Sequence, residues 1–171
     1  EYYEYVLVYV YDVLCMSDQP MNTMKDIKAS FNLKNDKIEE PSMYLGAEIS
    51  MMHNETNKEC WAMSSEKYCA AAITNVTESL AKKGLRLPSK CPTPLSNGYR
   101  PEIDVTAELK ADGVQYYQEH VGILRWTVEI GRVDILLEVS MMSSHLTLRR
   151  EGHLEQVIHI FGYLKTHKSL D

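Results

Sequence analysis

The sequence lacks the patterns that mark several common protein classes. Its four cysteines, Cys15, Cys60, Cys69 and Cys91, form no C-x-x-C pair, so they predict neither a zinc ribbon nor a disulfide framework. We therefore expect a reducing intracellular compartment, cytoplasmic or nuclear. The longest apolar run, YVLVYV, is far shorter than a membrane span, and we expect no membrane partner.

The usual catalytic and metal-binding motifs are also missing. No G-x-S-x-G nucleophile elbow and no glycine-rich phosphate loop occurs. The last four histidines are spaced by six or eight residues rather than the four that stack two imidazoles on one helix face, so we interpret them as surface or half-buried side chains. They are His145, His153, His159 and His167.

What the sequence does contain is enough apolar material for a folded core. The chain has 171 residues, 44% of them hydrophobic, which favours one domain or two small packed subdomains. A net charge of −6 argues against a surface built as a whole to attract nucleic acid, although a local basic patch stays possible.

The N-terminal part predicts strands with one helix between them. YVLVYVYDVLC, residues 5–15, is apolar on both alternating faces, which is typical of a strand buried on both sides, and Tyr11-Asp12 indicates a turn. MNTMKDIKASFNL predicts an amphipathic helix packed on this hairpin. Residues 43–52 predict a strand in which Gly46 allows a close backbone approach, and 60–64 its hairpin partner.

The C-terminal part predicts helices. A helix begins after Ser64 or Ser65 and runs through EKYCAAAITNV. Residues 79–101 hold most of the prolines and five cations without one acid, so we expect a basic linker, and apolar residues at helical spacing beyond it predict a small bundle. The expected domains are residues 1–78, a linker at 79–104 and a helical region at 105–171.

The basic linker has two interpretations. Its cations Lys82, Lys83, Arg86 and Lys90 are the candidate contacts to a nucleic-acid backbone, because a run of positive charge can follow phosphates. Charge runs of this size are more often solvated loops. Both interpretations stay open from the sequence.

The hairpin opens a series of family motifs. YVLVYVYDVLC resembles the Y-V-D-D hairpin of Ty1/copia-type retrotransposon reverse transcriptases, with Tyr9, Val10 and Asp12 matching and Tyr11 in the place of the first aspartate. MYLGAEIS resembles the family's F-L-G-I-E-I segment, WAMSSEKY its L-S-Q-x-x-Y helix and CPTPL its T-P motif. YYQEHVGILRWTVEIGRVDI and GHLEQVIHIFGYLKTH resemble its last two blocks. The motifs follow in order over nearly the whole chain.

This resemblance implies an α+β fold: the rear of a polymerase palm, made of antiparallel hairpins and packed helices, followed by thumb-like and connecting helices. It implies an RNA-directed DNA polymerase (a nucleotidyltransferase) that uses Mg²⁺ and an RNA/DNA template-primer. The remaining parts of a Pol polyprotein, with fingers and an earlier palm strand upstream and ribonuclease H downstream, would be its partners. The chain begins at Glu1 rather than Met, and we expect a longer parent protein.

The resemblance also implies that the catalytic site is degenerate. Asp12 is the remnant of the aspartate pair and the one expected metal ligand, whereas Tyr11 replaces the aspartate that bridges two metal ions. A neutral phenol cannot replace that carboxylate, so we expect an inactive chain. One alternative is a functional Tyr11 supported by another acid such as Glu48. Another is a domesticated, non-enzymatic binding or structural module derived from a retroelement.

Overall fold

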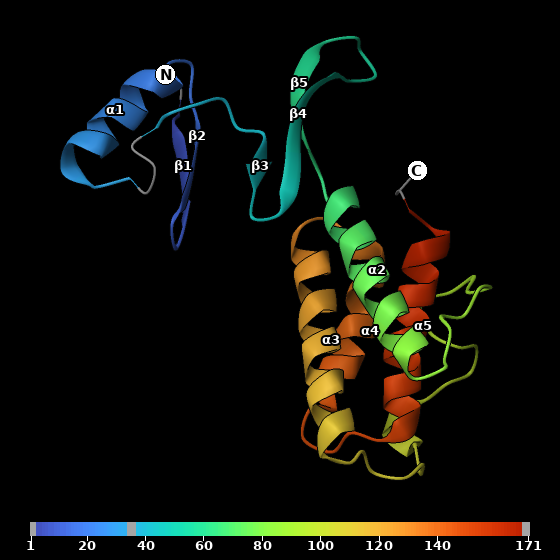
Figure 1. Ribbon diagram of the computed structural model, residues 1–171. Helices are drawn as coiled ribbons and strands as arrows, with labels where there is room; N and C mark the ends of the chain where they lie inside the picture. Colours follow the sequence, from blue (N-terminus) through green and yellow to red (C-terminus); the bar gives the residue numbers. More distant parts are fainter. Residues whose placement is uncertain (1–2, 34–36, 169–171) are drawn as a thin grey trace. The chain divides into compact units, whose positions relative to one another are not determined.

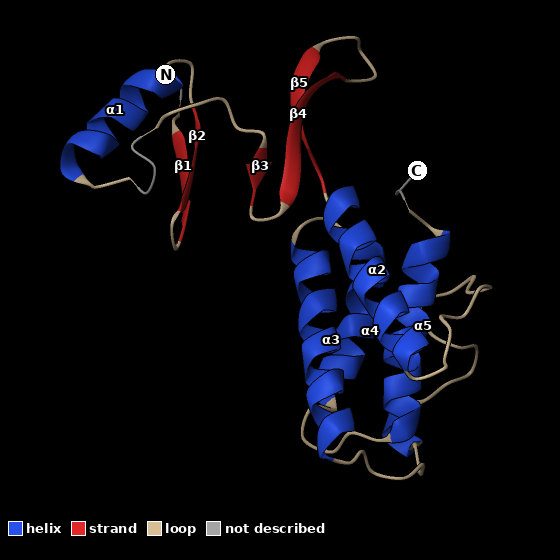
Figure 2. Ribbon diagram, in the orientation of Figure 1, coloured by secondary structure: helices blue, strands red, loops and turns tan. Residues whose placement is uncertain are grey.

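The computed structural model describes residues 3–33 and 37–168 and divides into two compact units (Figure 1). Unit 1 is Glu1–Met63 and unit 2 is Ser64–Asp171. Unit 1 carries the antiparallel strands and one helix, and unit 2 carries the other helices (Figure 2). Strands and helices thus segregate along the chain, and the predicted α+β class is confirmed.

Unit 1 opens with the predicted hairpin. Strand β1 (Tyr5–Tyr9) pairs antiparallel with β2 (Asp12–Met16), and Tyr9 lies opposite Asp12 across a two-residue turn. Helix α1 (Pro20–Ser30) follows with proline in its first turn, where the missing N–H costs no hydrogen bond, and it contacts β2. The hairpin and its helix are confirmed.

The predicted burial of this hairpin is wrong. Every residue of β1 is exposed; Val8 keeps 66% of its accessible surface and Tyr11, at the turn, keeps 75%. The physical reason is that a two-stranded ribbon has two faces to cover, and the helix that packs on it, α1, does so through β2. An apolar pattern specifies which faces can be buried, and a covering element decides whether they are.

The second sheet of unit 1 has three strands where two were predicted. They run in the order β3 (Met43–Tyr44), β4 (Ala47–His53) and β5 (Glu59–Ser64). The single strand predicted over 43–52 is broken because Leu45 and Gly46 both have positive φ, 54° and 87°, the pattern of a type I′ hairpin turn. Gly46 therefore serves the turn, where its positive φ costs no strain.

Unit 2 is a helical bundle with one hydrophobic core. Its helices are α2 (Glu66–Lys82), α3 (Ala111–Glu129), α4 (Leu136–Ser144) and α5 (Glu151–Thr166), with short 3₁₀ segments η1 (Pro101–Ile103) and η2 (Val133–Ile135). The predicted helical stripes are confirmed on α3 and α5, where Tyr117, Leu124, Val157 and Phe161 lie in the core. On α4 the buried residues are Val139 and Met142.

The structure divides at a different place from the predicted domain boundary. The two compact units meet at Met63 and Ser64, not at residues 79–104. Helix α2 belongs with the bundle because its Ala72, Val76 and Leu80 lie in the same core as α3 and α5. The stretch expected to be a linker is a loop of unit 2.

Candidate functional site

The hairpin tip is the first part of the candidate site. Tyr11 occupies the turn and Asp12 begins β2, so both side chains stand at the end of the ribbon. The phenol of Tyr44, at the end of β3, has a raised pKa because it is buried and because the negative charge of Asp12 acts on it. The Asp12 carboxylate is thus within electrostatic reach of the second sheet of unit 1.

The turn carries backbone strain. Val10 has a φ of 51°, in the left-handed region that β-branched residues rarely enter. A conformation of this kind costs about 1–3 kcal/mol and is common at functional sites, where the surrounding structure holds it. The strained residue lies directly before Tyr11 and Asp12.

The residues at this tip do not fit a pair of magnesium ions. Mg²⁺ in two-metal sites is held by several oxygen ligands, usually carboxylates that converge. In residues 3–33 and 37–168, no group of three or more His, Cys, Asp or Glu side chains is placed to hold a metal ion. Asp12 is the carboxylate that the tip itself offers, and Glu48 joins no such group with it.

The four candidate phosphate contacts lie on unit 2. Lys82 is the last residue of α2, and Lys83, Arg86 and Lys90 follow on the loop, all of them exposed. The Lys83 ammonium also lies 4.3 Å from the centroid of the Tyr116 ring, a cation–π contact that orients it. The cations are therefore accessible to solvent or a ligand, with Lys83 already partly engaged.

The loop that presents these cations is fixed to α5. Leu87 and Cys91 are buried, the backbone N–H of Ser96 donates to Gln156 Oε1 over 2.9 Å, and His159 Nε2 lies 3.1 Å from the Thr93 carbonyl oxygen. At Gly162 a Cβ would come within 2.8 Å of Cys91 Sγ, so only glycine allows the loop this close to α5. The basic segment is therefore a loop held against α5, whereas a linker was expected.

Sequence reasoning missed a buried ion pair. Arg132 is 2% exposed and donates from Nε and Nη2 to both carboxylate oxygens of Asp134, over 2.9 and 2.7 Å, while its Nη1 donates to the His167 carbonyl oxygen. The pair ties the connection between α3 and α4 to the end of α5. Both residues lie in GRVDI, at the end of one of the blocks on which the family resemblance rests, and that block was the available signal.

A second polar cluster joins the loop after η1 to the start of α5. Asp104 accepts hydrogen bonds from the Tyr99 hydroxyl and from the Thr106 backbone and hydroxyl. The buried His153 accepts at Nδ1 from the Arg150 N–H and lies, through Nε2, 3.1 Å from the Pro101 carbonyl oxygen. Local side-chain bonding of this type leaves little trace in a hydrophobic pattern, and the cluster was not predicted.

Comparison with known proteins links the chain to a transposon. It is similar to a protein of Saccharomyces cerevisiae whose name ascribes it to the transposon Ty5-1, with 27% identity over 169 residues. The match covers 97% of this chain and 50% of the yeast protein, so the chain spans about half the length of the curated relative it matches. No protein-family model and no solved structure matches the chain. The similarity supports an origin in a transposable element.

The described helices also bear on the membrane expectation. In the part of the chain that the structure describes, no helix combines the length and the apolar character needed to cross a membrane.

Proposed function

We propose that the chain is part of a Ty1/copia-type reverse transcriptase and that it does not polymerise DNA as it stands. The observation that carries the proposal is the β1–β2 hairpin, whose tip presents Tyr11 and Asp12 where the resemblance expects the aspartate pair. The likeness to a transposon protein over 97% of the chain supports the same origin.

The proposed loss of activity follows from the missing carboxylate ligands for metal ions. A two-metal displacement needs several carboxylates that hold both ions, the primer end and the triphosphate in one alignment. At the described tip Tyr11 replaces one of these carboxylates. Among the described residues, Asp12 belongs to no group of three or more side chains that could hold a metal ion. Weak contact with a template-primer, through Lys82, Lys83, Arg86 and Lys90, is the activity that would remain.

A primer-extension assay tests the proposed inactivity. The parent chain and the Tyr11→Asp variant are incubated with an oligo(dT)-primed poly(rA) template, dTTP and Mg²⁺. We expect no extension from either, but a rise of the hairpin's thermal stability with Mg²⁺ in the variant alone, because two adjacent carboxylates attract a hard dication better than one. Extension by the parent would show that Tyr11 is no lesion.

A salt titration tests the template-primer binding. Replacing Lys82, Lys83, Arg86 and Lys90 by Gln should weaken binding to an RNA–DNA hybrid and reduce its log–log salt slope, by up to about 0.9 for each phosphate that is no longer neutralised. The control replaces four exposed lysines that lie elsewhere, Lys25, Lys58, Lys110 and Lys168. Equal slopes in both variants would mean that the basic loop is only solvated.

One observation favours the second candidate function, a non-enzymatic binding module. The β1 strand, whose residues are apolar or aromatic, is exposed along its whole length, and large exposed apolar patches mark interaction sites. A partner bound through this face would stay bound at high salt, whereas hybrid binding through the basic loop would not. Binding measured at two salt concentrations therefore separates the two functions.

A further inference from the structure

A serine and a histidine meet on unit 2, away from the hairpin and the basic side chains described above. The Ser96 Oγ atom, on the loop after α2, lies 3.4 Å from Nδ1 of His159 in α5, and both residues are half-buried. A serine hydroxyl alone is a weak nucleophile, and a base within reach of its proton activates it. The distance is longer than an ideal hydrogen bond, as nucleophile–base distances often are before a substrate binds.

The other ring nitrogen of His159 decides which nitrogen accepts a proton. Nε2 lies 3.1 Å from the Thr93 carbonyl oxygen, which accepts hydrogen bonds and donates none, so Nε2 carries the proton of the neutral ring. Nδ1 is then unprotonated and accepts from the Ser96 hydroxyl. The Thr93 carbonyl thus holds the imidazole in the tautomer that a general base needs.

A thiol competes for the same nitrogen but is closed to solvent. Cys91 Sγ lies 3.8 Å from His159 Nδ1, and Cys91 is fully buried, with 0% of its surface accessible. The Ser96 hydroxyl belongs to a half-buried residue on the loop surface. A substrate from solution therefore meets the hydroxyl and not the sulfur.

A hydrogen-bond donor lies beside the pair. Gln156 is 7% exposed and precedes His159 by three residues, so the two side chains leave α5 on the same face. Its Oε1 accepts from the Ser96 backbone N–H over 2.9 Å, and within the described residues its Nε2 group makes no hydrogen bond. A nearly buried donor next to a nucleophile is the arrangement that stabilises an oxyanion.

We propose that Ser96, His159 and Gln156 form a small acyl-transfer centre that accepts activated esters. The Ser96 oxygen attacks the ester carbonyl carbon, its proton passes to His159 Nδ1, and Gln156 Nε2 holds the negative oxygen. The C–O bond then breaks, the alcohol leaves with the proton from His159, and the acyl group stays on Ser96. Water that gives its proton to His159 releases the acyl group as a carboxylic acid and restores the serine.

The orienting group sets the substrate class. A carbonyl oxygen holds the His159 ring in place, but unlike a carboxylate it carries no full charge to stabilise an imidazolium. The base is therefore modest, and esters of small acids with a good leaving group are the substrates that fit. This centre rests on unit 2 alone and is independent of the proposed polymerase origin.

Mass spectrometry of the full chain after exposure to p-nitrophenyl acetate tests the proposal. We expect an acetyl group on Ser96 together with release of p-nitrophenolate. Ser96→Ala should abolish this acetylation, and because the backbone N–H that binds Gln156 remains, the loop stays anchored. His159→Gln should slow the acetylation by about 100-fold or more, the usual contribution of a general base.

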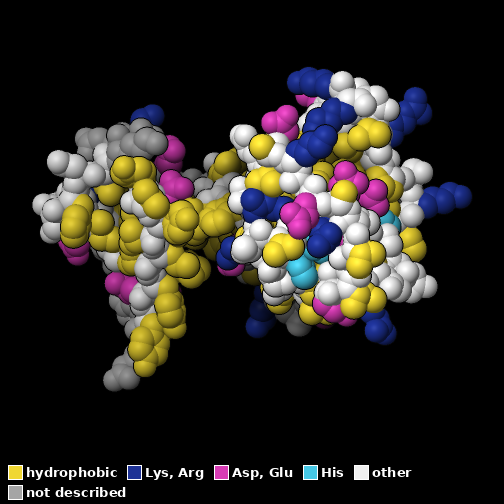
Figure 3. Space-filling model, turned by 90° about the horizontal axis from the view of Figure 1, so that it is seen from below, with side chains coloured by type: hydrophobic (Ala, Val, Ile, Leu, Met, Phe, Trp, Pro, Cys, Tyr) yellow, Lys and Arg dark blue, Asp and Glu magenta, His cyan; other side chains and the backbone are white. Residues whose placement is uncertain are grey.

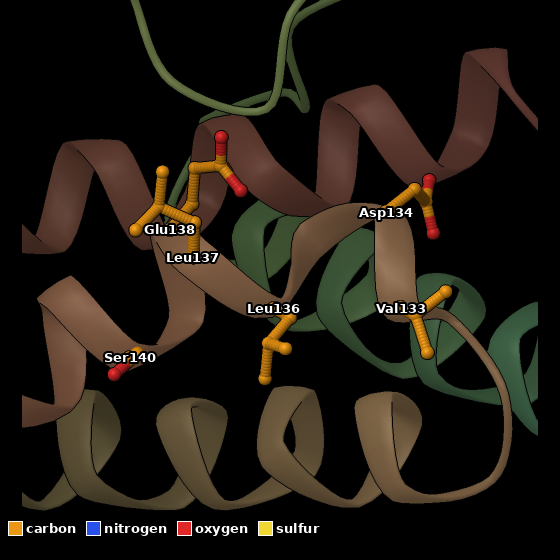
Figure 4. Close-up of a pocket in the computed structure, with 6 residues that line it drawn as sticks. All are labelled: Val133, Asp134, Leu136, Leu137, Glu138 and Ser140. Carbon is orange, nitrogen blue, oxygen red and sulfur yellow. The ribbon is translucent and has the colours of Figure 1, made fainter.

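Two controls separate the centre from general reactivity. Ser140 is exposed on α4, in a hollow whose lining contains two acids and no histidine (Figure 4), so Ser140→Ala should leave the acetylation of Ser96 unchanged. His53 is exposed in β4, and His53→Gln measures how much ester any accessible imidazole cleaves. Circular dichroism shows whether each variant is folded.

The variant Gln156→Glu tests the oxyanion donor. A carboxylate keeps an acceptor for the Ser96 N–H, so the contact between loop and helix remains, but it offers no donor and repels a negative oxygen. We expect acetylation of Ser96 to slow by about tenfold or more.

Three results would overturn the proposal. The first is an acetyl group on lysines or on Cys91 with none on Ser96. The second is equal release of p-nitrophenolate by the parent and by a folded Ser96→Ala variant. The third is an unchanged rate in Gln156→Glu, which would leave the centre without a group that stabilises the oxyanion.

Discussion

The two units bury their apolar residues to very different extents. Among the described residues, Tyr44 and Ala47 are the buried hydrophobics of unit 1, whereas unit 2 encloses a core that draws on four helices and the loop after α2. Yellow side chains cover much of the visible surface of the strand-bearing part in Figure 3, while the bundle shows mixed charges. Unit 2 is stabilised by its own interior, and unit 1 depends on local strand pairing.

Charge separates the units as well. Residues 1–63 contain 11 acidic and 5 basic residues, which gives −6, the net charge of the whole chain, so residues 64–171 are balanced. A two-stranded hairpin is marginally stable in water, and repulsion among acids adds to that weakness. The comparison teaches that unit 1 is the part of the molecule that gains most from a bound partner.

The largest expected difference comes from core truncation. Phe161 in α5 is fully buried, and Phe161→Ala should lower the free energy of unfolding of unit 2 by about 3–5 kcal/mol, through lost transfer energy and a cavity. Val8→Ala on the exposed β1 strand should change stability by no more than about 0.5 kcal/mol. Urea titration of each variant gives both values.

Tryptophan fluorescence can follow each unit separately. Trp61 lies in β5 and Trp126 in α3, so Trp61→Phe leaves a reporter on unit 2 and Trp126→Phe leaves one on unit 1. A destabilisation by Phe161→Ala that appears equally at Trp61 would show that the two units unfold together, and the comparison would fail.

The buried ion pair should give the next largest effect. Arg132→Met leaves the Asp134 carboxylate and the His167 carbonyl oxygen without their donor, and removing one partner of a buried pair costs about 3 kcal/mol or more. The control is Glu108→Gln, in a pair whose Glu108 side chain is 69% exposed and whose carboxylate lies 3.9 Å from the Arg150 guanidinium. Exposed pairs contribute up to about 1 kcal/mol. Equal destabilisation by Arg132→Met and Glu108→Gln would therefore contradict a stabilising role for the buried pair of Arg132 and Asp134.

These contrasts also show what the sequence could predict. The apolar faces of α3 and α5 were predicted correctly, because a 3.6-residue period places Tyr117 and Leu124 on one face of α3 and Val157 and Phe161 on one face of α5. The hairpin was correct because a turn signal interrupted two apolar runs. Burial of β1 was wrong because the same alternation describes a covered strand and an uncovered one. The ion pair of Arg132 was missed because a pattern of charges does not reveal which charges meet.

Acid should weaken unit 2 first through two histidines. Burial lowers the pKa of His120, which stacks 3.8 Å from Tyr116, and burial together with His153 lowers that of His145. A histidine with a lowered folded pKa takes up its proton more readily in the unfolded chain. Stability from these two residues is therefore complete above about pH 6.5 and is lost as the pH falls below it.

Asp104 adds a second, more acidic step. Burial alone would raise its pKa, but the hydrogen bonds from Thr106 and Tyr99 outweigh burial and lower it to about 2. Its contribution is present above the ordinary value of 3.8 and is lost between 3.8 and about 2. Melting temperatures of unit 2 from pH 8 to pH 2 should show both steps, and His120→Gln should flatten the first. A curve without a decline near pH 6 would contradict the histidine assignment.

The smallest expected effect lies at the strained turn of unit 1. Val10→Gly should stabilise the hairpin by roughly 1 kcal/mol, because glycine adopts a φ of 51° without strain and loses only part of that gain to its greater freedom in the unfolded chain. The control is Tyr11→Gly, at a turn position without positive φ. This change should lower the stability of the hairpin by about 0.5–1 kcal/mol. Hydrogen exchange of the β1 and β2 amides measures both changes, and slower exchange in α3 or α5 of the Val10 variant would show that the hairpin stabilises the bundle after all. Faster exchange of the β1 and β2 amides in Val10→Gly would mean that the variant hairpin is less stable, and Val10 would then not be the source of strain.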